Sequence, residues 1–275
     1  MLLLCSMHFS KKRSSFHHIR LFFAGLAVLI FATTSFAQIP ARQVKHNFHT
    51  WTSINSTMRF TNRWGMMADV HVRRNNGVKD ASFYFARIGA NYWLNEKITF
   101  SLAYGHLWLA PSTAGWKTFG DEHRIHQQAQ YAGALGKVGM LQRIRNEQRW
   151  VEKIANDQPT GKWRFTNRLR YLINFNIPLN NKPHRLSLVL ADEIMMHQGK
   201  EVVYNSLDQN RIFIGIRQNL GHAWSYDAGY MNVYQQKYSG YQYDMNHTFR
   251  LFFYYTPDFR KSKSVAMHVP NLSDE

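Results

Sequence analysis

Two stretches of this sequence carry arginines and other polar residues at alternate positions. These residues are the clearest candidates for chemistry in the chain. They are Arg143, Arg145, Glu147 and Arg149 in the first stretch, and Arg164, Arg168 and Arg170 in the second. Successive side chains of a β-strand point to opposite faces, so this spacing collects the charges on one face of each strand. Guanidinium groups bind carboxylates and phosphates in a bidentate geometry, so such a face suits ion pairing or anion binding.

The same alternation predicts more charged residues on the matching face of other segments. The additional arginines are Arg73, Arg87, Arg124, Arg211, Arg217 and Arg250, and the acids are Asp69, Glu122, Glu193 and Asp227. Arginines therefore outnumber acids on this face. Two interpretations stay open. The residues form an ion-pair network that packs an interior, or the surplus arginines face water and attract anions.

Strands must position these residues, because the alternation continues from Asn47 to Tyr255. We expect eleven segments, at 47–58, 62–74, 82–93, 97–109, 121–134, 139–151, 162–175, 184–196, 208–220, 223–235 and 243–255. Strands in soluble sheets most often have about 5 or 6 residues. Segments of about 11 residues or more are what a tilted strand needs to cross a membrane.

The connections between these segments favour a closed barrel. Tight turns such as Asn95-Glu96 and Gly136-Lys137 alternate with longer loops, including one expected at 157–161. Tryptophans mark the segment ends: Trp64, Trp93 and Trp224 beside tight turns, and Trp108, Trp150 and Trp163 beside loops. This pattern predicts an antiparallel transmembrane β-barrel with two aromatic girdles, short periplasmic turns and longer extracellular loops. A soluble β-sandwich is the alternative, but it would leave rows of arginines on its outer faces.

The strand count is expected to be about twelve, with ten as the next choice. Bacterial single-chain barrels have even numbers of strands, and residues 38–46 are able to supply one more than the eleven segments. Residues 47–259 then form a single barrel domain, followed by a polar tail at 260–275.

The N-terminal region predicts export. Lys11, Lys12 and Arg13 precede the apolar run 21–31, and a small-x-small signature ends at Ala37. This is the layout of a secretory signal peptide over residues 1–37, cleaved after Ala37. The only cysteine, Cys5, lies inside it. We therefore expect the outer membrane of a Gram-negative bacterium.

The composition limits the partners. The net charge is +17, and only four of the 34 Lys and Arg residues fall in the signal region. A basic exported protein meets anionic membrane surfaces and anionic solutes rather than nucleic acid. Expected partners are outer-membrane lipids, lipopolysaccharide and anionic small solutes. Candidate rim residues for lipopolysaccharide phosphates are Arg74, Lys79, Lys117, Tyr238 and Tyr241.

Catalysis is the competing class of function. The available side chains are His123, His126, His197, His222, Ser187, Ser225, Asp192 and Asp227. They show no diagnostic spacing, and the sequence has no Gly-x-Ser-x-Gly elbow and no His-x-x-x-His metal pair. We assign no catalytic, cofactor or metal residue. A small channel or binding barrel for anionic solutes is favoured over an envelope- or lipid-modifying enzyme or a structural or receptor barrel.

An ordered series of short motifs resembles an uncharacterised outer-membrane family. The pieces are Glu122-His123-Arg124-Ile125 with Gln127-Gln128, the row Arg143 to Arg149, the row Arg164 to Arg170, Asp192-Glu193, Gln209-Asn210-Arg211 with Gly215, and Gly229-Tyr230-Met231. This series is similar to the marks of the family called domain of unknown function 2490, over roughly Asn47 to Tyr255. The resemblance implies an outer-membrane β-barrel and brings no substrate, reaction or catalytic residue.

Overall fold

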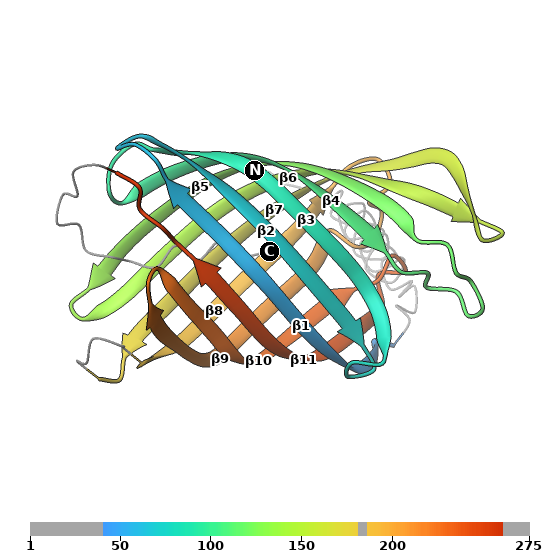
Figure 1. The fold of residues 1–275 in the computed structure, drawn as a ribbon. Coiled ribbons are helices and arrows are strands. Elements are labelled where there is room, and N and C mark those ends of the chain that lie inside the picture. The colour runs from blue at the N-terminus through green and yellow to red at the C-terminus, as the bar shows by residue number, and fades with distance from the viewer. Residues whose placement is uncertain (1–40, 181–185, 261–275) are drawn as a thin grey trace, which may run out of the picture. The chain divides into compact units, whose positions relative to one another are not determined.

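The computed structural model describes residues 41–180 and 186–260, which form a closed barrel of eleven β-strands (Figure 1). The strands are β1 (Gln43–Arg59), β2 (Trp64–Asn75), β3 (Asp80–Trp93), β4 (Ile98–Leu109), β5 (Gly120–Leu135), β6 (Val138–Ala155), β7 (Gln158–Pro178), β8 (Leu186–Gln198), β9 (Leu207–Gly221), β10 (Trp224–Gln236) and β11 (Gln242–Tyr255). The prediction of an all-β barrel is confirmed. No helix in the described ranges is long and apolar enough to cross a membrane.

The barrel closes through a parallel pair. Ten neighbouring pairs are antiparallel, whereas β1 runs parallel to β11 from the pair Gln43–Gln242 to the pair Ser56–Tyr255 (Figure 1). In an up-and-down barrel an odd number of strands makes the first and last strands run in the same direction. The count of eleven lies between the expected ten and twelve. Residues 38–46 supply no separate strand in the described part, because β1 itself begins at Gln43.

The two ends of the barrel carry different connections. One end, the loop rim, bears the connections between β2 and β3, β4 and β5, β6 and β7, β8 and β9, and β10 and β11. Its longest described connections are residues 110–119 and 199–206. The opposite end, the turn rim, has tight connections such as residues 136–137 and 222–223.

The β6–β7 hairpin differs from the expected loop at 157–161. The pairing continues outward to Ala155 and Gln158, so Asn156 and Asp157 make a two-residue turn. Both turn residues have positive φ, at 52° and 57°, as a type I′ turn requires. As a result, β6 and β7 project beyond their neighbours (Figure 1).

The two faces of each strand differ as their alternation predicts. In β6, Arg145 and Glu147 face the interior and are 0% and 1% exposed. Ile144, which lies between Arg143 and Arg145, is 54% exposed. Trp64, Trp108 and Trp163 are exposed near the rims. The prediction of a girdle position is wrong for Trp93, which is buried at 4% exposure. The Arg59 guanidinium stacks on it, 4.8 Å from its ring.

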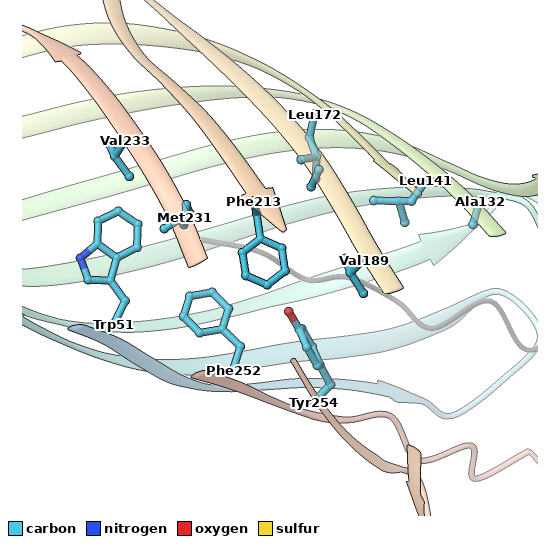
Figure 2. Packing of buried hydrophobic residues seen from close by; sticks show 11 residues of the cluster. Trp51, Ala132, Leu141, Leu172, Val189, Phe213, Met231, Val233, Phe252 and Tyr254 are labelled. Carbon is cyan, nitrogen blue, oxygen red and sulfur yellow. The ribbon is translucent and has the colours of Figure 1, made fainter. Parts of the chain in front are cut away.

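An apolar cluster fills part of the interior (Figure 2). Its members are Trp51, Ala132, Leu141, Leu172, Val189, Ala191, Phe213, Met231, Val233, Phe252 and Tyr254. The cluster extends from Trp51 and Val233 to Leu141 and Ala132, which flank the 136–137 turn. Gly215 makes room for it, since a Cβ there would collide with the Phe213 ring and the Ala228 carbonyl. The predicted signal peptide at residues 1–37 and the tail residues 261–275 lie outside the described residues.

Candidate functional site: an arginine lattice and its cavity

A lattice of arginines and carboxylates covers the inner face of β5 to β9, and Glu147 on β6 is its centre. Arg168 Nη2 donates to Glu147 Oε2 at 2.5 Å, and Arg170 Nη1 donates to Oε1 at 2.7 Å. Arg145 and Arg124 approach the same carboxylate at 3.5 and 4.0 Å. Four guanidinium groups from three strands therefore surround one acid, which is possible because the β6–β7 register sets Glu147 opposite Arg168.

Glu122 and Glu193 extend the lattice on either side. Glu122 accepts hydrogen bonds from Arg124 Nε at 2.7 Å and Arg149 Nε at 2.6 Å. Glu193 accepts from Arg143 Nη2 and from Arg170 Nη2, both at 2.7 Å. Arg211 reaches Glu193 at 3.7 Å. Because Arg124 and Arg170 each contact two carboxylates, the three acids form one connected network.

Two smaller ion-pair groups lie outside the lattice, one joining β9, β10 and β11 and the other joining β2 and β3. Asp227 on β10 accepts from Arg217 Nε at 2.5 Å and lies 3.5 Å from Arg250 Nη2. Asp69 on β2 pairs with Arg87 on β3, and both side chains are fully buried. Cation–π contacts supplement the Asp227 group, since the Arg250 guanidinium lies 4.2 Å from the rings of Phe213 and Phe252.

Asp208 and His197 join the lattice, but neither is among the residues predicted to form the ion-pair network. Asp208 Oδ2 accepts from Arg168 Nη1 at 2.8 Å and lies 3.1 Å from His197 Nε2. The register shifts there, with Met195 opposite Gln209 and Met196 opposite Leu207, so Asp208 is an extra residue in β9. A bulge reverses the facing of the residues beyond it. Strict alternation from Arg211 would turn Asp208 outward, and no local sequence signal marks the bulge.

The structure places every predicted site residue on the inner face, and all of them except Arg164 belong to three ion-pair groups. The β5–β9 lattice contains Glu122, Arg124, Arg143, Arg145, Glu147, Arg149, Arg168, Arg170, Glu193 and Arg211; the two smaller groups contain Arg87, Arg217 and Arg250. Arg164 is different. Its guanidinium stacks on Tyr238 at 4.6 Å, and it has no carboxylate partner within residues 41–180 and 186–260.

A cavity of about 400 Å³ occupies the interior at the loop rim, above the lattice. Its charged lining consists of Arg73, Arg124, Arg149, Arg164, Arg168, Arg170, Arg211 and Lys237, with Glu122 and Asp208 as the acids. Cations therefore outnumber acids around the cavity, although Glu147 and Glu193 lie directly behind several of them. Arginine-rich concave sites attract and bind anions.

The residues available for catalysis are not assembled. His197 lies beside Asp208, and its Nε2 accepts a hydrogen bond from Arg149 Nη1 at 3.1 Å, but Ser187 is at the other end of β8. His123 faces outward against Tyr104, and His222 lies in a turn-rim connection. Within the described part of the chain, no group of three His, Cys, Asp or Glu side chains is arranged to hold a metal ion.

Comparison with curated proteins found no match, and comparison with solved structures found none either. A family model, described as protein of unknown function (DUF2490), matches residues 48–261. The match begins in β1, runs through all the strands that carry the lattice and ends just beyond β11. The chain belongs to the DUF2490 family.

Proposed function

We propose that this protein is an outer-membrane barrel that binds anionic solutes in the arginine-lined cavity at its loop rim. The observation that carries the binding proposal is the surplus of guanidinium groups around a cavity of about 400 Å³. Ligand sites are commonly cavities of about 300–1,000 Å³ with a few convergent polar groups. The cavity size and lining thus match a binding site for a small molecule.

The outer face of the barrel supports membrane residence. Large apolar side chains are exposed on strand after strand, including Ile54, Val70, Ile88, Leu102, Ile144, Leu169, Ile194, Ile214 and Phe249. A soluble monomer rarely exposes contiguous apolar surface of this extent. A closed barrel also satisfies its backbone hydrogen bonds internally, as lipid requires. The predicted signal peptide supplies the route of export.

Membrane residence has a direct test. The expressed protein is expected to fractionate with the outer membrane and to migrate differently in electrophoresis before and after boiling. Recovery as a freely soluble periplasmic protein would refute the membrane proposal.

Arg164 is the residue most available to an incoming anion. It lines the cavity, and its Nε is buried without a hydrogen-bond partner among the described residues. Tyr238 holds the guanidinium in place from the β10–β11 connection. An anion reaching Arg164 does not have to displace a carboxylate, whereas an anion at Arg168 competes with Glu147 and Asp208.

The binding test uses inorganic phosphate and the purified barrel in detergent, measured by calorimetry. We expect Arg164→Gln to weaken phosphate binding by about tenfold, the equivalent of one charge-assisted hydrogen bond. Arg63→Gln is the matched control, since Arg63 lies 5.9 Å from the Tyr92 ring at the turn rim. Absence of phosphate binding, or equal losses in the two variants, would overturn the proposal.

The apolar cluster favours binding over passage through the barrel. Phe213, Phe252 and Tyr254 are each at most 2% exposed and lie together inside the barrel (Figure 2). In planar bilayers we therefore expect no steady conductance. A stable anion-selective conductance would instead identify the protein as a channel.

A further inference from the structure

The cavity has two chemically different walls. The β5–β9 arc carries the arginine lattice, while the arc from β10 through β1 to β4 contributes Trp51, Phe83, Phe85, Leu109 and Val233. These arcs are the two halves of one closed ring of strands, so the walls face each other across the interior. The arginine lattice is therefore opposed by a wall that carries these aromatic and aliphatic side chains together with Arg73 and polar residues such as His49 and Ser82.

Arginines also lie against these aromatic rings, with Arg73 inside the second arc and Arg211 and Arg124 on the strands that adjoin it. The Arg73 guanidinium lies 3.5 Å from the Trp51 ring and 4.5 Å from the Phe83 ring. Arg211 approaches Trp51 at 5.0 Å, and Arg124 approaches Phe85 at 5.8 Å. Cation–π contacts of this kind fix the position of the guanidinium groups.

The size of the cavity excludes a simple anion as its complete occupant. A cavity of about 150 Å³ accommodates a benzene molecule, so 400 Å³ corresponds to a ligand of roughly 15 non-hydrogen atoms. Phosphate or sulfate would occupy the arginine side and leave the aromatic wall against water. A whole two-chain phospholipid is too large.

We propose that the cavity takes a small anionic amphiphile, with one carboxylate or phosphate head and an aromatic or branched apolar body. This inference rests on the proposed anion-binding function and narrows its ligand class. The head group binds at Arg164 and the neighbouring lattice arginines. The apolar body packs against Phe83, Trp51 and Val233, where its burial contributes affinity in proportion to the area removed from water.

Three probes test the ligand class by calorimetry: inorganic phosphate, phenyl phosphate and phenol. We expect phenyl phosphate to bind at least about tenfold more tightly than either of the others, since it alone engages both walls. This comparison uses the unaltered protein, so it does not depend on the folding of any variant.

Phe83→Ala then locates the apolar wall. We expect it to weaken the binding of phenyl phosphate severalfold more than it weakens the binding of inorganic phosphate. Phe165→Ala is the matched control, because Phe165 is 42% exposed on the outer face of β7.

The outcomes separate the two proposals. Equal binding of the two phosphates, with both weakened by Arg164→Gln, would overturn the amphiphile proposal and leave anion binding intact. Binding of phenol as tight as that of phenyl phosphate would remove the role of the arginines and overturn both. Failure of all three probes to bind would also overturn both.

Discussion

The loop-rim half and the turn-rim half of the barrel interior surround their buried arginines with different groups. In the loop-rim half, Arg168 and Arg170 share Glu147 and leave a cavity above them. In the turn-rim half, Arg250 packs against two aromatic rings beside the part of the apolar cluster that extends to Leu141 and Ala132. Because side chains alternate between the two faces of a strand, the inner face can carry either arrangement. The choice between them decides whether the interior can admit a solute.

The difference also separates what each half needs for stability. Burying an ion pair costs desolvation free energy. Removing one partner leaves the other charges unpaired in a medium that solvates charge poorly. An apolar cluster depends on close packing, so its losses follow the volume removed. Four variants, taken in order of expected effect, test this comparison.

Glu147 in the loop-rim half is expected to give the largest effect. Glu147→Gln removes the charge that Arg168, Arg170, Arg145 and Arg124 surround, so it should lower the free energy of unfolding by about 3–5 kcal/mol. Urea titration of the detergent-solubilised barrel, followed by tryptophan fluorescence, measures the change. Glu201→Gln is the control, because Glu201 forms a half-exposed pair with Lys153 at 3.9 Å. Equal effects would show that the lattice does not depend on its central acid.

Leu172 tests the packing of the turn-rim half. It is 3% exposed within the cluster, so Leu172→Ala should cost about 2–5 kcal/mol in unfolding free energy. Leu169 lies on the outer face of the same strand and is 43% exposed. Leu169→Ala should therefore cost much less in the same urea titration. A larger loss for Leu169 would mean that the interior cluster is loosely packed.

Glu96 at the turn rim tests an exposed network by pH. Hydrogen bonds from Arg59, at 2.7 and 2.9 Å, lower the Glu96 pKa from its ordinary value of 4.5, and Arg260 adds to the effect. A carboxylate with a lowered folded-state pKa stabilises the fold above its unfolded pKa, and the contribution disappears as pH falls through the folded value. Glu96→Gln should lower the melting temperature slightly at pH 7, consistent with about 0.2–1 kcal/mol for an exposed pair. The difference from the unaltered protein should shrink as the pH falls below about 4.5 and through the lowered folded-state pKa; a difference that does not depend on pH would contradict this account.

Asp157 at the loop rim should give the smallest effect on global stability. Its carboxylate accepts hydrogen bonds from the backbone N–H groups of Thr118 at 2.8 Å and Lys117 at 3.0 Å, which lower the Asp157 pKa. Asp157→Asn should release the 110–119 connection from the β6–β7 turn without changing the unfolding midpoint. Faster tryptic cleavage after Lys117 would show this release. Unchanged cleavage would mean that the connection is held by other contacts.

The sequence by itself determined the barrel and the facing of nearly all its charged residues. Alternation alone sets Arg143, Arg145 and Glu147 on one face and Ile144 on the other, because the strand period is two whatever the neighbouring strands do. Long segments with this pattern also favoured a closed sheet over a β-sandwich.

Only the tertiary structure decided which residues meet. The parallel β1–β11 pair depends on how the strands close, and the bulge that turns Asp208 inward depends on the pairing of β8 with β9. Trp93 faces the interior although its position beside a turn predicted a girdle residue. The apolar cluster and the two-walled cavity arise for the same reason. They are built from inner-face residues of strands far apart in sequence, and those residues come together only when the ring of strands closes.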